Sequence, residues 1–159
     1  MHSGEIIKLV ASILVCLLAG IIGSFFTQPA IPGWYASLNK PSFNPPNWIF
    51  GPVWTFLYIT MGIAAFLIWK TGLNNPLVKI ALVIFIIQLI LNSVWSIAFF
   101  GFKSPFAGLI IIIFLWIAII TTMFFFYKVS KPAMFLLIPY ILWVSFAAVL
   151  NYSIYTLNR

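Results

Sequence analysis

The residues of this chain that could do chemistry are aromatic rings and neutral amides, and they recur at helical spacing. One such set lies at positions i, i+4, i+7, i+8 and i+11, on one face of an α-helix: Gln88, Asn92, Trp95, Ser96 and Phe99. Aromatic rings stack on flat apolar molecules, and amides donate hydrogen bonds to carbonyl or carboxylate oxygens. The pattern therefore predicts noncovalent recognition of a ligand.

Two further apolar segments carry a comparable face. The second segment contributes Trp54, Tyr58, Met61, Gly62 and Ala65, and the fifth contributes Tyr140, Trp143, Ala147, Leu150 and Asn151. Taken singly, each polar residue is explained equally well as a bridge between helices, worth about 0.6–2 kcal/mol. Taken together, three such faces predict a largely apolar pocket with a few polar groups.

Groups for acid–base and metal chemistry are almost missing. Glu5 is the only carboxylate and His2 the only histidine, and both precede the first apolar segment. Hydrolysis by general acids and bases, metal ligation and nucleophilic triads lack their residues. Ion-coupled transport usually needs ionisable groups at mid-membrane, and none stands there. We expect no metal site, no required cofactor and no conventional enzyme.

The composition is that of a membrane protein. Of 159 residues 64% are hydrophobic and 6% charged, and the formal net charge is +7. Soluble domains are about 45–50% apolar and about 25% charged. The cations stand singly at the ends of apolar segments rather than in a basic patch, which argues against nucleic-acid binding. The lipid bilayer is the expected surrounding.

Five apolar segments follow one another along the chain. Each approaches the roughly 20 residues needed to cross a membrane. Asn75-Pro76 and Ser104-Pro105 place a capping side chain before a proline at the first helical position. The sequence predicts an all-α integral membrane protein, one domain over residues 1–159, with a bundle of five transmembrane helices and a long loop over residues 27–47 between the first two. The predicted helices are about 6–26, 48–69, 77–100, 106–127 and 133–157.

The first segment could also be a signal peptide, but it exceeds the usual apolar length and has no A-x-A-like cleavage site. We therefore expect it to be a helix. Small residues recur along it at three- and four-residue spacing, at Ser12, Cys16, Gly20 and Gly23. Such a stripe allows close helix packing in lipid, either within its own bundle or between two copies.

The distribution of cations predicts an orientation. With alternating helices, five lysines share the N-terminal side, whereas Lys40, Lys103 and Arg159 share the other. This bias favours a multi-pass protein of the cell membrane with its N-terminus in the cytoplasm.

The long loop is rich in proline and aromatic residues. Pro41, Pro45 and Pro46 restrict their own φ and push the preceding residues toward extended conformations. A loop of this kind is stiff, so we expect it to cover the pocket as a lid. Pro52 and Pro139 are expected to bend the second and fifth helices.

Specific motifs in these segments resemble one known family. Trp34-Tyr35-Ala36-Ser37-Leu38-Asn39-Lys40-Pro41, Asn44-Pro45-Pro46-Asn47-Trp48 and Gly51-Pro52-Val53-Trp54 are similar to the tryptophan-rich sensory protein and translocator protein family (TspO/MBR, the peripheral benzodiazepine receptors). The resemblance continues through Leu91-Asn92, Trp95, Pro139-Tyr140, Trp143 and Leu150-Asn151-Tyr152, and so covers essentially the whole chain.

The resemblance implies a five-helix membrane protein, usually a homodimer, that binds porphyrins (protoporphyrin IX or a haem-like tetrapyrrole), sterols in some members, and benzodiazepine-type ligands. Carried over by position, it implies a ligand site in this chain made of Tyr35, Pro45, Trp54, Tyr58, Asn92, Trp95, Ser96, Trp143, Ala147 and Leu150.

Two departures from the family pattern stand out. Residues 109–113 of the fourth segment are all Leu or Ile where many relatives have an acidic residue. The loose sterol pattern at the C-terminus runs through Leu150, Tyr155 and Arg159, whereas Tyr152 has its arginine too far downstream.

Together these observations predict a membrane receptor or sensor for porphyrins and similar flat hydrophobic ligands. Two alternatives remain open, a facilitative transporter of porphyrin or sterol and a catalyst of light-dependent porphyrin degradation. In the catalytic case the candidate residues are the redox-capable rings of Trp54 and Trp143.

Overall fold

The computed structural model describes residues 2–159, and among these the regular structure is entirely helical. Five spans are long and apolar enough to cross a membrane, as the sequence predicts. The elements are α1 (Ser3–Ala30), the π-helix η1 (Ile31–Tyr35), α2 (Asn47–Trp69), α3 (Pro76–Ser96), the π-helix η2 (Ile97–Gly101), α4 (Pro105–Val129), α5 (Lys131–Phe135) and α6 (Ile138–Leu157).

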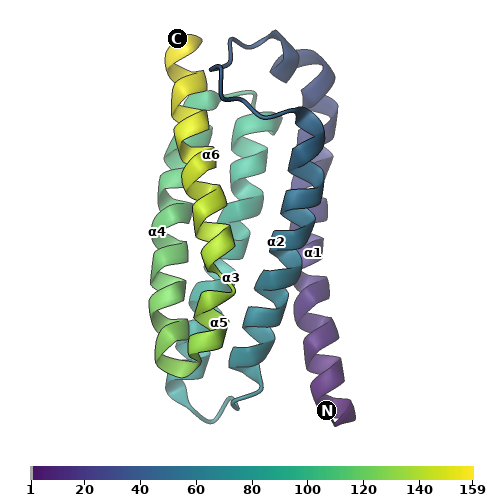
Figure 1. Cartoon of the computed structure of the whole chain (residues 1–159), viewed down its shortest axis with the longest axis vertical. Helices are drawn as coiled ribbons and strands as arrows, with labels where there is room; N and C mark the ends of the chain where they lie inside the picture. The colour runs from purple at the N-terminus through teal and green to yellow at the C-terminus, as the bar shows by residue number, and fades with distance from the viewer. Residues whose placement is uncertain (1) are drawn as a thin grey trace.

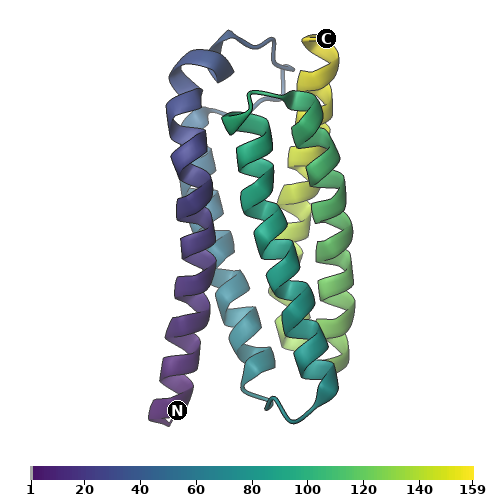
Figure 2. The same ribbon diagram turned by 180° about the vertical axis from the view of Figure 1, so that it is seen from behind.

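The helices run side by side in alternating directions (Figure 1). The N-terminus and the connections α2–α3 and α4–α5 lie at one end, which we call the N-terminal end. The α1–α2 loop, the α3–α4 connection and the C-terminus lie at the other, the loop end, as the reverse view also shows (Figure 2). The connections between successive membrane spans thus lie at the two ends of the bundle, with the helices between them.

The first helix is longer than predicted. The expected boundary at residue 26 is wrong, because α1 continues to Ala30 and passes directly into η1. Pro29 and Pro32 each lack an N–H, but prolines are tolerated in membrane helices where local π geometry satisfies the backbone again. Here the N–H of Ala36 donates to the carbonyl of Ile31, five residues earlier. The irregular loop shrinks from the predicted 27–47 to about residues 38–46.

The fifth span is interrupted rather than bent. We expect one helix over residues 133–157, but α5 ends at Phe135 and α6 begins at Ile138. Pro139 cannot donate to the carbonyl four residues earlier, that of Phe135, and its ring crowds that carbonyl. The helix therefore breaks one turn before the proline.

The half of the bundle nearest the N-terminal end is solidly packed. Met61, Ala64 and Ile68 of α2 are fully buried, together with side chains of α3, α4 and α6. The rings of Phe85 and Phe126 stack with centroids 5.6 Å apart. This half holds the larger of two apolar cores.

Close approach of α1 to its neighbours depends on small residues. Gly62 lies against the backbone of Ile13, so closely that any Cβ there would overlap Ile13. The Ser93 hydroxyl donates to the carbonyl of Ala19 at 3.0 Å. Of the predicted small-residue stripe, Ser12, Cys16 and Gly23 are buried in the same bundle. The structure therefore uses this stripe for contacts inside one copy of the chain.

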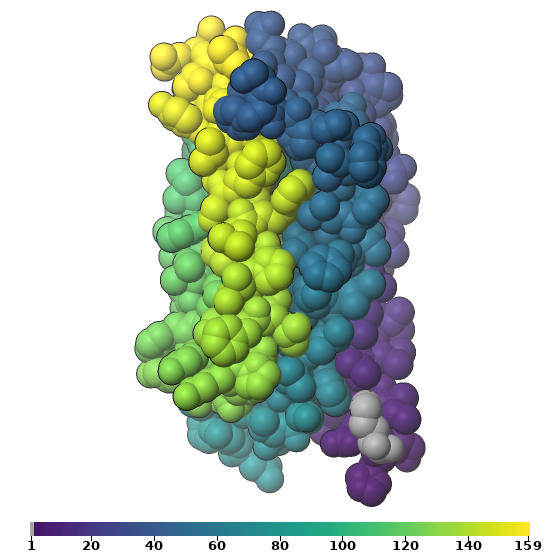
Figure 3. All heavy atoms as spheres, in the orientation of Figure 1, coloured from purple at the N-terminus to yellow at the C-terminus, as the bar shows by residue number. Residues whose placement is uncertain are grey.

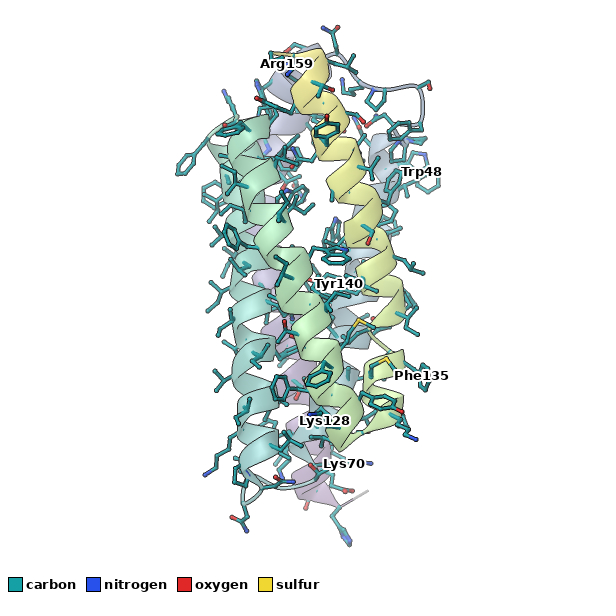
Figure 4. The ribbon with its side chains drawn as sticks, turned by 90° about the vertical axis from the view of Figure 1, so that its left-hand side faces the viewer. Trp48, Lys70, Lys128, Phe135, Tyr140 and Arg159 are labelled. Carbon is teal, nitrogen blue, oxygen red and sulfur yellow. The ribbon has the colours of Figure 1, made fainter. Side chains whose placement is uncertain are left out.

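Lysines mark the N-terminal end, and several cover an aromatic ring. Lys70 and Lys128 lie at this end in Figure 4, opposite Arg159. The Lys8 ammonium lies 5.7 Å from the ring centroid of Trp69, and that of Lys128 lies 4.2 Å from Phe124. Paired cations and rings of this kind are typical of a membrane–water interface.

Candidate ligand cavity

A cavity of about 510 Å³ lies in the half of the bundle nearest the loop end. Ligand pockets usually measure about 300–1,000 Å³ and are mostly apolar. Its walls come from α1, η1, α2, α3, η2 and α6, and no charged side chain contributes. The lining residues are Leu17, Gly20, Ile21, Gly23, Ser24, Thr27, Gln28, Ile31, Tyr35, Asn47, Trp48, Phe50, Gly51, Trp54, Thr55, Tyr58, Trp95, Ser96, Phe99, Phe100, Ala147, Leu150, Asn151 and Ile154.

One wall of the cavity is a row of nearly parallel rings. Trp54 stacks on Tyr58 with centroids 5.6 Å apart and planes 28° apart. Trp54 and Trp95 lie 6.4 Å apart at 32°, and Trp95 stacks on Phe99 at 5.8 Å and 28°. Aromatic pairs in such arrangements are favourable, and together the rings give this wall an apolar aromatic surface. The wall is suited to a planar ligand.

The floor of the cavity is formed where α1 and α2 meet. A Cβ at Gly20 would overlap the ring of Tyr58, so the glycine allows this ring to lie against α1. Tyr58 and Leu57 are buried, and the solid core begins directly below them. The cavity is therefore closed toward the N-terminal end.

A chain of hydrogen bonds runs beneath the floor and joins three helices. The Tyr58 hydroxyl donates to Asn92 Oδ1, Asn92 Nδ2 donates to the Tyr140 hydroxyl at 3.0 Å, and that hydroxyl donates to Gln88 Oε1 at 2.8 Å. Gln88, Asn92 and Tyr140 are each exposed by 1% or less. Figure 4 shows Tyr140 at mid-height inside the bundle. Asn92 thus acts as a bridge between α2, α3 and α6, and it does not line the cavity.

Asn151 holds one of the wall rings in place. Its Oδ1 accepts from Trp95 Nε1 at 3.1 Å, and its Nδ2 donates to the carbonyl of Pro105 at 2.8 Å. Asn151 itself is 1% exposed and closes one corner of the cavity. This amide fixes the Trp95 indole relative to both α6 and the start of α4.

The loop, about residues 38–46, is fastened at both sides of the loop end, although none of its residues lines the cavity. The Tyr35 hydroxyl donates to Asn44 Oδ1 at 2.8 Å. Asn39 N donates to Asn158 Oδ1 at 2.9 Å, and Asn158 Nδ2 donates back to the Asn39 carbonyl at 2.8 Å. Figure 3 shows the loop against the C-terminal turn of α6. The Lys40 ammonium donates hydrogen bonds to the carbonyls of residues 36 and 38.

The structure brings together seven of the ten predicted site residues. They line the cavity: Tyr35, Trp54, Tyr58, Trp95, Ser96, Ala147 and Leu150. Pro45 lies in the loop and Asn92 lies under the floor. Trp143 packs beside the cavity against Phe50 and Phe146, with ring centroids 6.0 and 5.5 Å away. Of the two candidate redox rings, only Trp54 lines the cavity.

Sequence reasoning overlooked the wall from α1. Gly20, Ser24, Thr27 and Ile31 line the cavity at successive turns, followed by Gln28 near its mouth. Their spacing of four, three and four residues is a helical face, but small and short polar side chains at that spacing equally indicate helix packing. Leu17 and Ile21 of the same helix also line the cavity, so the composition of this face does not distinguish a cavity wall from a packing surface.

Known proteins with similar sequences agree with this architecture. A family model described as the TspO/MBR family matches residues 12–157. The chain is 51% identical to a tryptophan-rich protein TspO of Archaeoglobus fulgidus, over 97% of this chain and 99% of the relative. It is 49% identical to the protein of the same name in Chlorobaculum tepidum, over 97% and 98%.

More distant relatives include a eukaryotic one. A translocator protein of Homo sapiens is 37% identical over 89% of this chain and 85% of that protein. The family model matches most of the chain, and the two TspO relatives are covered almost completely. The chain therefore belongs to the TspO/MBR family of multi-pass integral membrane proteins.

Proposed function

We propose that this protein is a membrane receptor that binds porphyrins and similar flat hydrophobic molecules in the cavity between α1, α2, α3 and α6. The observation that carries the proposal is the row of aromatic rings from Tyr58 through Trp54 and Trp95 to Phe99, with neighbouring planes 28–32° apart. A planar aromatic ligand gains stacking energy along such a wall in addition to the burial of its apolar surface.

Among the polar side chains deep in the wall, Ser96 is available to a ligand. It lines the cavity, and the structure gives its hydroxyl no hydrogen-bond partner within residues 2–159. The other deep polar groups are already used, Tyr58 by Asn92 and Asn151 by Trp95. We therefore assign orientation of the ligand core to Ser96 rather than to Asn92.

A receptor fits the cavity better than a channel or a through-pore. Below Tyr58 the bundle is filled by buried side chains, so no path continues to the N-terminal end. Facilitative transport of porphyrin or sterol is the second candidate. It is favoured by one feature, the exposure of lining residues Ile21, Trp48 and Thr55 between α1 and α2, which leaves the cavity accessible from the bilayer.

The ends of the bundle support the orientation predicted from the lysines. Five lysines gather at the N-terminal end, and we propose that this end faces the cytoplasm of a cell membrane while the loop faces outward. The lysines are Lys8, Lys70, Lys79, Lys128 and Lys131.

Equilibrium titration with protoporphyrin IX in lipid nanodiscs tests the receptor proposal. We expect saturable, one-site binding, read from the porphyrin absorption band and from quenching of tryptophan fluorescence. Ser96→Ala should reduce affinity by about fivefold, the size of one neutral hydrogen bond. Linear uptake that equals the uptake of empty nanodiscs would refute the proposal. Efflux from porphyrin-loaded vesicles, measured in parallel, distinguishes transport from binding.

A further inference from the structure

A second, smaller cavity of about 350 Å³ lies at the loop end, and we call it the outer groove. It is formed between residues 25–34 of α1 and η1 and residues 100–103 of η2 and the turn that follows. Figure 2 shows this turn beside the end of α1. Among the described residues, the outer groove shares only Phe100 with the ligand cavity, so the two are separate features.

The lower side of the outer groove continues into an apolar strip on α1. Phe25 lines the groove and is 72% exposed. Ile22 and Leu18, three and seven residues earlier, lie on the same face of the helix and are also exposed. In a membrane this face is covered by acyl chains, because it presents only hydrocarbon and aromatic surface. A molecule in the groove can therefore extend an apolar tail along α1.

The upper side of the outer groove carries one cation. Lys103 is the charged residue that lines it, and its ammonium has neither a hydrogen-bond partner nor an aromatic ring beneath it within residues 2–159. Lys40 and Lys128, by contrast, each lie over a ring. The one side-chain carboxylate of the chain, that of Glu5, is in the first turn of α1 at the opposite end. The protein therefore leaves the charge of Lys103 without a counterion.

The backbone at Lys103 is unusual for a lysine. Its φ is 53°, in the left-handed region that glycine and asparagine adopt more readily. The turn between η2 and α4 thus carries a long cationic side chain where local preference favours a small one. Residues held in this way occur often at binding sites. We use this position below, because asparagine can replace the lysine there without disturbing the turn.

Trp34 supplies a second donor. It lines the outer groove, its ring packs on Phe99 and Phe100 with centroids 5.5 and 6.4 Å away, and its indole N–H has no hydrogen-bond partner in the described part of the chain. Tryptophan is typical of the headgroup level of a membrane, where its ring is in apolar surroundings and its N–H meets polar groups. A cation and an N–H donor above an apolar strip match a lipid that has an anionic head.

From these observations we infer that the outer groove binds one anionic glycerophospholipid of the leaflet at the loop end. Its phosphate lies on the Lys103 ammonium and the Trp34 indole N–H, and an acyl chain follows Phe25 and Ile22 along α1. The phosphate oxygens accept charge-assisted hydrogen bonds, which are stronger than neutral ones. This lipid site is independent of the proposed porphyrin cavity.

The first experiment compares lipids on the full-length protein in detergent by native mass spectrometry. Dioleoylphosphatidylglycerol should bind at least about threefold more tightly than dioleoylphosphatidylcholine or dioleoylglycerol, since only the first combines the acyl chains with a net negative headgroup. Equal binding of either control lipid would overturn the inference. Glycerol 3-phosphate, added at the same concentration, should not displace the anionic lipid. Displacement would show a site for soluble phosphates instead of a lipid site.

The second experiment removes the cation. Lys103→Asn should weaken binding of phosphatidylglycerol about three- to tenfold and leave the binding of dioleoylglycerol unchanged, because only the charged headgroup loses a partner. The melting temperature should not fall, since asparagine tolerates the positive φ. Lys79→Asn removes the same charge from an exposed lysine of α3 at the other end of the bundle and is the matched control. An equal loss in both variants would mean that net charge attracts the lipid, and it would overturn the site.

The third experiment fills the outer groove. Gly33 lines it, and a Cβ at this position would meet no atom within 4 Å, so the ring introduced by Gly33→Phe can enter the open space without displacing the backbone. We expect a loss of phosphatidylglycerol binding of about tenfold or more, with melting temperature and porphyrin titration unchanged. Gly4→Phe is the control, because its Cβ is equally free but lies in the first turn of α1. Wild-type lipid binding by Gly33→Phe would overturn the inference.

Discussion

The two halves of the bundle are built from the same apolar helices but are packed differently. Toward the N-terminal end, α1 and α2 are in contact through Gly62 and Ile13, and side chains such as Ala64 and Ile119 are completely buried. Toward the loop end, the same two helices, together with α3, η2 and α6, surround a cavity of about 510 Å³. Hydrophobicity alone therefore does not decide where a membrane bundle is solid. The difference lies in which residues face inward.

The boundary between the halves is a polar layer. Tyr58 belongs to both, since its ring is the floor of the cavity and its hydroxyl starts the chain to Asn92, Tyr140 and Gln88. Below this layer, Gly62 allows α1 and α2 to meet. A rigid floor lets the cavity persist without a ligand, which is the preorganisation that favours binding.

The largest expected effect is a loss of stability from a substitution in the solid half. Gly62→Val would force a side chain against the backbone of Ile13, and overpacking of this kind costs about 1–3 kcal/mol or more. We expect a clear fall in the melting temperature measured in detergent. Gly4→Ala is the control, because a Cβ there meets no atom within 4 Å. If Gly62→Val melts like the wild type, the contact between α1 and α2 is not as close as the structure shows.

The next effect concerns the boundary layer. Asn92→Leu should leave the Tyr58 hydroxyl without its buried acceptor and remove one of the two bonds of the Tyr140 hydroxyl, at a cost of about 1–3 kcal/mol. We expect the ligand-free melting temperature to fall while porphyrin affinity changes little. Thermal unfolding and titration of the same variant measure both. Unchanged stability with lost affinity would instead make Asn92 a ligand contact.

A smaller effect, on ligand affinity, is expected from substitutions in the hollow half. Trp54→Ala removes a lining ring that contacts both Tyr58 and Trp95, whereas Trp143→Ala removes a ring outside the lining. Stacking adds about 0.5–1.5 kcal/mol to area burial, so Trp54→Ala should weaken protoporphyrin binding by about tenfold. The loss of binding free energy caused by Trp143→Ala should be less than half of that caused by Trp54→Ala. The reverse order in the titrations would show that the ligand lies nearer Trp143 of α6 than Trp54 of α2.

Much of the bundle is predictable from the sequence because membrane length and helix caps are local signals. Asn75 accepts from the N–H of Leu77 and Ser104 from that of Ala107, as their positions before Pro76 and Pro105 predict. The end of α1 is not predictable in this way. Whether Pro29 and Pro32 stop a membrane helix or convert its end to π geometry depends on the neighbours that satisfy the backbone.

The site is partly predictable for a related reason. A stripe of Trp54, Tyr58 and Trp95 shows which faces turn inward, but it does not show which side chains are occupied by each other. Asn92 and Ser96 lie on the same helical face, and only their contacts separate a bridge between helices from a free hydroxyl in a cavity. The wall from α1 could not be predicted, because small and short polar side chains at helical spacing indicate helix packing as readily as a cavity.

The central claim, that one half is solid and the other hollow, is tested most directly by the same substitution in each half. Ala64 is completely buried in the solid half, and Ala147 lines the cavity. We predict that Ala64→Leu lowers the melting temperature of the ligand-free protein, as overpacking by about 1–3 kcal/mol requires. Ala147→Leu should leave it unchanged or raise it, because the new methyl groups fill empty space. Equal destabilisation by both substitutions would contradict the account.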